Sequence, residues 1–298
     1  MPLFKPSMRN FLKTANKKPG IPLVEQLHGV IYMRFPYLYI GIGKGDHWSS
    51  PIISALTRLA NKLLPQSDVG KVFADTYHGK VVPIETAKTL VSVQEEISIT
   101  FSEKVIPYPL ARDLILRDPD HIAVLDCPCR VSKKQSCLPL DVCLIIGEPF
   151  ASMAIEHHPK RSRWITQTEA IQIIEEEEKR GHVHHAFFKQ AMIGRFYAIC
   201  NCCACCCGAM QAHQNGIPML ASSGYISRLD EDLCLGCGVC VEACQFLAIT
   251  MVNDGITINE TQCMGCGICV SHCAQRALSL ELEPNKGEPL TIPYPPHQ

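Results

Sequence analysis

The sequence predicts an α+β protein with a mixed α/β, cysteine-rich N-terminal domain and a small duplicated C-terminal domain. Three observations lead to this prediction. The chain of 298 residues is long enough for about two domains. Over most of its length, short apolar runs alternate with stretches of helical periodicity, as in folds that combine strands with helices. One cysteine pattern then occurs twice within residues 234–273. We therefore expect domains over residues 1–222 and 223–283, followed by a proline-rich tail over 284–298 that forms an extended strap or a disordered end.

The composition suits a protein with a sizeable core and no nucleic-acid footprint. Apolar residues make up 47% of the chain, the mean hydropathy is +0.06 and the net charge is −1. The sequence shows no secretory signal and no apolar run of the ~20 residues that a transmembrane helix needs. The 18 cysteines lie at the spacings of metal ligands, including adjacent pairs that form disulfides poorly. We therefore expect a reducing compartment, the cytoplasm.

Near the N-terminus, the patterns indicate one strand and one helix. Residues 37–40, Tyr-Leu-Tyr-Ile, are typical of a strand, and three glycines at 41, 43 and 45 follow as a tight turn. The glycines lack the spacing of a dinucleotide-binding motif or a P-loop, so we predict no nucleotide site. Apolar residues recur with helical spacing over 52–64, between Pro51 and Pro65, which predicts a helix with one face in the core.

A second helix is predicted over residues 169–180. Thr166 and Glu169 form a capping box at its start, and Gly181 provides the stop. The glutamates at 175–178 are expected on a solvated surface. Three histidines follow the helix, and they fit metal ligation, proton relay or a helix end that faces solvent. They are His182, His184 and His185.

Two strand-like segments in the middle of the chain each lead into cysteines. Residues 122–125 precede Cys-Pro-Cys-Arg at 127–130, and residues 195–199 precede six thiols within eight residues. The first set comprises Cys127, Cys129, Cys137 and Cys143, and the second comprises Cys200, Cys202, Cys203, Cys205, Cys206 and Cys207. If the two strands were parallel neighbours, all ten thiols would meet at one edge of a sheet.

We hypothesise that these ten thiols hold at least one further iron–sulfur cluster, or a zinc ion. The simplest ligand set is the first one, Cys127, Cys129, Cys137 and Cys143. Arg130 would then compensate anionic charge. The run over 200–207 would supply additional ligands or a redox centre. Because adjacent residues point in divergent directions, one ion or one cube cannot use all six of its thiols. Some must therefore support the ligands without binding the metal, serve another cluster or be redox-active.

The duplicated C-terminal pattern has the spacing of ligands to cubane iron–sulfur clusters. Its two copies are Cys234, Cys237, Cys240, Cys244 and Cys263, Cys266, Cys269, Cys273. Loops with two residues between thiolates wrap three of them around one cube. Glycines at 236, 238, 265 and 267 allow the sharp bends that bring amides close to sulfur. Zinc fits poorly, because structural zinc usually pairs two separated Cys-x2-Cys knuckles.

Residues 225–283 resemble a bacterial-type ferredoxin with two [4Fe-4S] clusters. The resemblance implies that the last cysteine of each copy binds the other cluster. The implied ligands are Cys234, Cys237, Cys240 and Cys273 for cluster 1, and Cys263, Cys266, Cys269 and Cys244 for cluster 2. It also implies a hairpin around Asn253-Asp254-Gly255 and short helices that start near Val239 and Ile268. The chain departs from the family at Gln245 and Ala274, where proline is usual.

The motifs at 127–130 and 199–203, with the glycine and histidines at 181–184 between them, resemble a loosely characterised group of ferredoxin-fused proteins from anaerobes. This resemblance covers about residues 80–283 and suggests that the two regions work together. These features favour an electron-transfer protein that serves a redox partner protein. Two alternatives are a reductase with its chemistry at residues 200–207, and a protein that binds copper(I) or zinc in that run for delivery.

Overall fold

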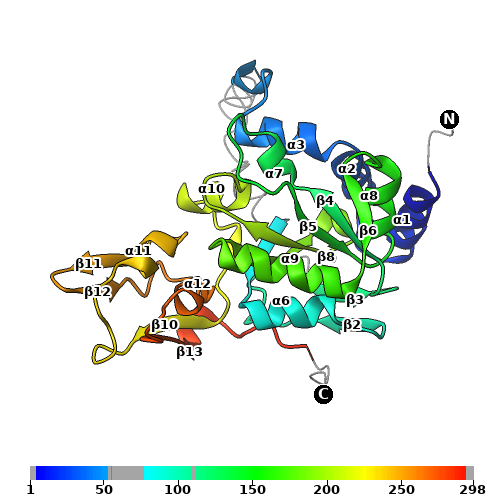
Figure 1. Cartoon of the computed structure of the whole chain (residues 1–298). Helices are drawn as coiled ribbons and strands as arrows, with labels where there is room; N and C mark the ends of the chain where they lie inside the picture. The colour runs from blue at the N-terminus through cyan, green and yellow to red at the C-terminus, as the bar shows by residue number, and fades with distance from the viewer. Residues whose placement is uncertain (1–4, 53–54, 56–76, 109–111, 293–298) are drawn as a thin grey trace.

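The computed structural model describes residues 5–52, 55, 77–108 and 112–292, and it confirms the predicted α+β class. A mixed sheet of nine strands forms the centre of the larger, N-terminal part, and helices lie on both of its faces (Figure 1). The smaller unit with the duplicated cysteine pattern lies beside this body, at the left of Figure 1.

The path of strands through the large sheet is β6-β4-β5-β8-β7-β1-β9, with β2 and β3 beside it. The strands are β1 (Tyr77–Val81), β2 (Ile97–Thr100), β3 (Asp113–Leu116), β4 (Ile122–Asp126), β5 (Asp141–Ile146), β6 (Ser162–Ile165), β7 (Val183–Lys189), β8 (Arg195–Cys202) and β9 (Leu220–Ala221). Strand β5 is antiparallel to both of its neighbours, β4 and β8. The two strands that lead into the cysteine motifs are therefore parallel to each other but separated by β5.

Alternate side chains of the sheet point into two separate cores, as the period of two in a strand requires. One core packs against α1 (Pro6–Lys17), α2 (Leu23–Arg34), α3 (Pro36–Lys44) and α8 (Phe150–His157). The other packs against α6 (Ile84–Val91) and α9 (Gln167–Lys179). In β4, for example, Ala123 and Leu125 belong to the first core, and Ile122 and Val124 to the second.

Several predicted elements are confirmed. Strands β4 and β8 cover the two strand-like segments that precede the cysteines. Helix α9 matches the predicted helix over 169–180, and its cap residue Thr166 accepts a hydrogen bond at 3.2 Å from the Glu169 amide. Gly181, with a φ of +76°, ends this helix as predicted.

The predicted strand over 37–40 is wrong, because these residues belong to α3. Pro36 begins this helix, and Gly45 ends it in the left-handed conformation with a φ of +83°. A short apolar run does not by itself distinguish a strand from a buried helix, so the proline and the glycine were the better signals. The predicted helix over 52–64 lies almost wholly outside the described residues.

The small unit consists of two-stranded pairs and two short helices. Its elements are β10 (Tyr225–Leu229), α11 (Val239–Ala243), β11 (Ile249–Val252), β12 (Gly255–Ile258), α12 (Ile268–Ser271) and β13 (Leu278–Leu282). Strands β11 and β12 form the predicted hairpin, with Asn253 at a φ of +51° in the turn, and β10 pairs with β13. Both helices start where the sequence predicted.

Beyond β13, the described part of the chain, to residue 292, runs back along the N-terminal part. The Lys80 Nζ donates a hydrogen bond at 2.9 Å to the Glu288 carbonyl, and Leu290 is buried in the core beneath α6 and α9. This part of the tail therefore packs along the N-terminal part. No helix among the described residues is long and apolar enough to span a membrane.

Gly265→Ala is expected to disrupt the small unit. Gly265 has a φ of +64°, and a Cβ atom there would lie 2.1 Å from the Tyr225 carbonyl oxygen and 2.3 Å from the Ser223 Oγ. The left-handed backbone alone costs an alanine roughly 1–2 kcal/mol, and the backbone clash adds to it. We expect a loss of more than about 2 kcal/mol in the free energy of unfolding, measured by anaerobic denaturant titration.

The matched control is Gly43→Ala, in α3, where a Cβ atom would meet nothing within 4 Å. Because alanine is the better helix former, this variant is expected to gain up to about 1 kcal/mol. Equal stability of the two variants would contradict the assigned role of Gly265.

Candidate metal centres

The strand order brings ten thiols to one end of the sheet. Cys143 in β5 lies opposite Cys200 in β8, and on its other side it lies opposite Leu125, two residues before Cys127. The sequence predicted this convergence through parallel neighbouring strands. That detail is wrong, because β5 lies between the two strands and contributes Cys143 from within the sheet.

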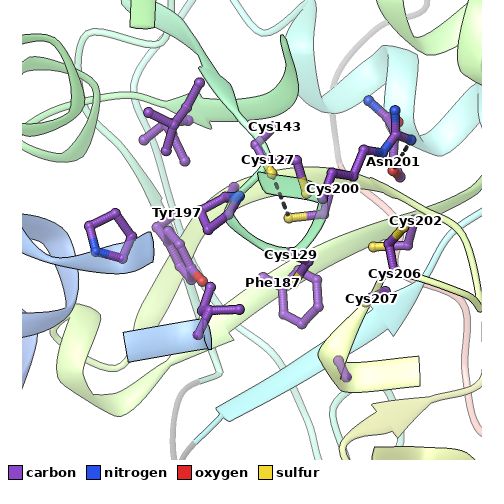
Figure 2. A pocket seen from close by; sticks show the side chains of 18 of the residues that line it. Cys127, Cys129, Cys143, Phe187, Tyr197, Cys200, Asn201, Cys202, Cys206 and Cys207 are labelled. Atoms are coloured by element: carbon purple, nitrogen blue, oxygen red, sulfur yellow. Dashed lines mark hydrogen bonds between the residues drawn. The ribbon is translucent and has the colours of Figure 1, made fainter. Parts of the chain in front are cut away.

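Six of the thiols form a ring in which each influences the pKa of two neighbours. The order is Cys127, Cys143, Cys200, Cys202, Cys207, Cys129 and back to Cys127. The Sγ atoms of Cys143 and Cys200 are 3.8 Å apart. Figure 2 shows these six cysteines around a small cavity of about 60 Å³. We call this set the six-thiol ring.

The pKa of every thiol in the six-thiol ring is raised. The largest influence on each thiol is a hydrogen bond to a ring neighbour. That bond lowers the pKa of Cys129 and Cys207, but a second neighbour and burial outweigh it. At the other four positions the bond itself raises the pKa. The ring is therefore protonated at neutral pH in the metal-free protein, and a bound metal has to displace protons.

The other four thiols form a second, separate group. The sulfur atoms of Cys137, Cys203, Cys205 and Cys206 all lie within 4.8 Å of one another. A tetrahedral ion with metal–sulfur bonds of about 2.3 Å holds its sulfurs roughly 3.8 Å apart, so this group has the spacing of a single-ion site. Cys205 is exposed, which leaves the site open to solvent. We call this set the four-cysteine group.

The pKa values differ within the four-cysteine group. Burial raises the pKa of Cys137 to about 11, and it also raises that of Cys203. Burial tends to raise the pKa of Cys206 as well, but hydrogen bonds from the Cys137 backbone and from the neighbouring thiols outweigh it, and the pKa is lowered. Cys206 is therefore the thiol best prepared to bind a first ion as a thiolate.

Two adjacent pairs of cysteines are divided between the two groups. Cys202 and Cys207 belong to the six-thiol ring, whereas their neighbours Cys203 and Cys206 belong to the four-cysteine group. The run is thus divided between two sites, which is one of the outcomes that the sequence left open. The expected divergence of adjacent side chains is wrong for Cys205 and Cys206, whose sulfurs lie 3.7 Å apart in the same group. The simplest ligand set predicted from the sequence, Cys127, Cys129, Cys137 and Cys143, is not formed. Cys137 lies instead with three thiols of the second run.

Arg130 carries a buried positive charge beside both groups. It donates hydrogen bonds to Glu177 at 2.5 Å and to the Asn201 carbonyl at 3.1 Å. It also lies 3.0 Å from His182 Nδ1, which bonds to Glu177 at 2.6 Å. Burial by itself lowers the pKa of Arg130, but Glu177 outweighs it, and Cys127 and Cys203 raise the pKa further. Arg130 thus lies near the thiols, but its charge is paired with Glu177, and its role as a counter-charge for the thiols stays a prediction.

The prediction of a solvated surface is wrong for Glu177 and Glu178, which are only 1% and 5% exposed. The three histidines are buried too, because they belong to β7 or directly precede it. His184 bonds to Glu178 at 3.0 Å and to Asn201 at 2.7 Å, and Asn201 lies between Cys200 and Cys202. These side chains therefore support the thiol-bearing end of β8 instead of facing solvent.

In the small unit, the eight cysteines line two cavities. One is lined by Cys234, Cys237, Cys240 and Cys273, and the other by Cys244, Cys263, Cys266 and Cys269. Backbone amides donate hydrogen bonds to three of the sulfurs, from Ala248 to Cys244 at 3.3 Å, from Ala277 to Cys273 at 3.4 Å and from Ser227 to Cys263 at 3.5 Å. Four thiols around a cavity with amides directed at sulfur fit a [4Fe-4S] cluster.

Residues 226–274 match the family of the 4Fe-4S dicluster domain. Such a domain implies two [4Fe-4S] clusters and electron transfer. No curated protein matches the chain. The match covers the duplicated cysteine pattern and does not extend to the ten thiols of the N-terminal part.

The small unit contacts the loop that carries the four-cysteine group. The Ala204 amide donates a hydrogen bond at 2.9 Å to the side chain of Gln245, the residue after Cys244. Phe246 packs edge-on against His213, with ring centroids 6.2 Å apart. Met264 and Ile268 are buried in the same core as Cys202 and Cys207. The dicluster domain is thus joined directly to the segment that contains the second run of thiols.

Metal loading of the N-terminal thiols is expected to release protons. At pH 7, zinc added anaerobically to metal-free protein should release at least about two protons per ion, because Cys137 and Cys203 have raised pKa values. Calorimetry in buffers of different ionisation enthalpy measures this number. Cys137→Ser should release about one proton fewer. A binding heat that does not depend on the buffer would contradict the protonated state of these thiols.

Proposed function

We propose that this chain is an electron-transfer protein in which two [4Fe-4S] clusters exchange single electrons with a third, cysteine-bound centre in the N-terminal part. Cluster 1 would use Cys234, Cys237, Cys240 and Cys273, and cluster 2 would use Cys244, Cys263, Cys266 and Cys269. The lining of the two cavities supports these sets. The clusters supply one-electron chemistry, and the polypeptide fixes their position and tunes their potentials.

The observation that carries this proposal is the contact between Gln245 and Ala204. It connects the residue that follows a proposed ligand of cluster 2, Cys244, to the loop between Cys203 and Cys205. Met264 and Ile268 of the small unit are buried in the core cluster against which Ala204 packs. Electrons would therefore pass between cluster 2 and the N-terminal thiols through a direct protein contact.

Within the N-terminal part, we assign different roles to the two thiol groups. The six-thiol ring is buried and surrounds a cavity. Four of its members would bind an iron–sulfur cluster. This cluster would accept electrons from cluster 2 or donate electrons to it. The four-cysteine group, with its single-ion spacing, would hold a structural ion such as zinc. The remaining ring thiols would stay protonated.

Cluster 1 would face an external redox partner protein. Leu235 and Val239, which line its cavity, are 71% and 44% exposed. Apolar side chains around a cluster provide contact area for a transient partner. Cluster 2, by contrast, faces the N-terminal part.

Metal analysis with electron paramagnetic resonance tests the proposal. Anaerobically purified protein should contain about twelve irons, with acid-labile sulfide to match, and about one zinc. Cys200→Ser should lower the iron content by about four without changing the signals of the two C-terminal clusters. About eight irons with stoichiometric copper or zinc and an unaffected Cys200→Ser variant would favour metal delivery instead.

Gln245→Leu is expected to slow electron exchange between cluster 2 and the N-terminal centre several-fold, because it removes the hydrogen bond to Ala204. Rapid-freeze electron paramagnetic resonance after anaerobic reduction measures the rate. The control is Gln275→Leu, at an exposed position beside the cavity of cluster 1. Equal rates in both variants would exclude the Gln245 contact as the route.

Ser227→Ala is expected to lower the midpoint potential of cluster 2. The Cys269 thiol donates a hydrogen bond at 3.3 Å to the Ser227 Oγ, and as a cluster-bound thiolate its sulfur would accept from that hydroxyl instead. Burial raises the pKa of Cys269, and the bond with Ser227 lowers it in part. A hydrogen bond to sulfur stabilises the more negative, reduced cluster. A differential on the order of 1 kcal/mol corresponds to ~40 mV for one electron. Redox titration should show this decrease in one of the two C-terminal signals, while Ser271→Ala leaves both unchanged.

A reductase is the second candidate, and the position of Cys129 favours it. This thiol belongs to the six-thiol ring and also lines a neighbouring cavity of about 290 Å³. A compound bound in that cavity would lie beside a redox centre. Reduced protein that is reoxidised by a substrate, but not after Cys129→Ser, would support a reductase over a carrier.

A further inference from the structure

A cavity of about 290 Å³ lies next to the six-thiol ring, and its size suits a small organic molecule. Tyr32 and Tyr39 line it from α2 and α3, and Ile217 and Met219 line it from the segment after α10 (Gly208–Gln214). Cys129 is the ring member that reaches it. None of the described residues that line this cavity is acidic.

Lys189, at the end of β7, is the unusual side chain of this cavity. It is 1% exposed, and its Nζ has no hydrogen-bond partner among the described residues. The Nζ lies over three aromatic rings, 3.6 Å from the centroid of Tyr32, 4.7 Å from that of Tyr39 and 5.0 Å from that of Tyr77. These rings attract the ammonium, but they do not neutralise its charge.

Two other lysines with buried side chains in the described part of the chain have partners. The Lys44 Nζ, which also lines the cavity, forms an ion pair with Asp46 at 2.8 Å and bonds to the Cys129 carbonyl at 2.8 Å. The Lys80 Nζ bonds to the Glu288 carbonyl. A buried donor without a partner costs free energy. An unpaired ammonium that lines a cavity therefore points to a ligand that pairs with its charge and accepts its hydrogen bonds.

The charge and walls of the cavity define the class of ligand. One unpaired cation balances one negative charge, and a phosphate dianion would leave a second buried charge without a partner. Aromatic and aliphatic walls favour a flat, apolar body. We propose that this cavity binds a small monocarboxylate with an apolar body, whose carboxylate pairs with the Lys189 ammonium and whose body lies between the tyrosine rings and Met219.

Binding should depend on pH in a defined direction. Burial lowers the pKa of Lys189 to about 7, while the nearby Glu25 raises it in part. Groups that face Lys189 are Glu25, His28 and Tyr32 from α2, Tyr39 from α3 and Tyr77 from β1. Burial raises the pKa of each of these tyrosines and lowers that of His28. The charged form of Lys189 is therefore lost as pH rises through about 7, and carboxylate affinity falls with it.

Isothermal titration of the anaerobically purified full chain tests the proposal, with benzoate as the probe and benzamide as its uncharged isostere. At pH 6, benzoate should bind at least about tenfold more tightly than benzamide. Its affinity should fall about tenfold between pH 6 and pH 8, because the ammonium fraction falls by that factor. Benzamide should show no such change.

Lys189→Met should remove both the preference for benzoate and its pH dependence. Lys80→Met, a buried lysine with a backbone partner, should retain both. Equal binding of benzoate and benzamide to the unaltered protein, or tighter binding of inorganic phosphate than of benzoate, would overturn the proposal. Full benzoate affinity in Lys189→Met would overturn it as well. The comparison of the two probes in the unaltered protein holds even if Lys189→Met does not fold.

Discussion

The whole N-terminal part depends on one electrostatic constraint, the crowding of ten thiols at one end of a sheet. Sulfurs this close together cannot all ionise without cations between them, because like charges in a buried site repel strongly. The six-thiol ring meets this constraint by staying protonated, as its raised pKa values indicate. The buried charge of Arg130 and the histidines bonded to Glu177 and Glu178 then surround the thiols with fixed, paired groups.

The dicluster domain meets a similar constraint by different means. Its thiols are spread around two cavities, and backbone amides donate to the sulfurs at equivalent positions of the two repeats, Ala248 and Ala277. This arrangement needs backbone that passes very close to the ligand loops. At Gly236 a Cβ atom would lie 2.1 Å from the Asp254 carbonyl oxygen. Glycine is therefore required there by space as well as by its φ of +61°.

How much the sequence predicts differs between the two parts, for physical reasons. In the small unit, local spacing determines the loops, so the hairpin at Asn253 and the helices at Val239 and Ile268 could be predicted. In the N-terminal part, the grouping of thiols depends on β5 lying between β4 and β8, a long-range pairing that periodicity does not encode. The adjacency of cysteines within 200–207 indicated that one ion or one cube cannot use all six thiols, but not how the thiols are grouped. Nothing in the sequence indicated a role for Lys189, because its surroundings are formed by three tyrosines that are distant in the sequence.

The departure of the two repeats from each other at Gln245 and Ala274 gives the duplicated unit a polarity. If the two repeats were identical, both ends of the unit would present the same surface. The end at which electrons enter could then not differ from the end at which they leave. Here one half carries a side-chain amide that anchors it to a neighbouring loop, and the equivalent position of the other half has only a methyl group. Two [4Fe-4S] clusters of identical composition would thereby have different protein surroundings. The two ends of the duplicated unit are then not equivalent for electron transfer.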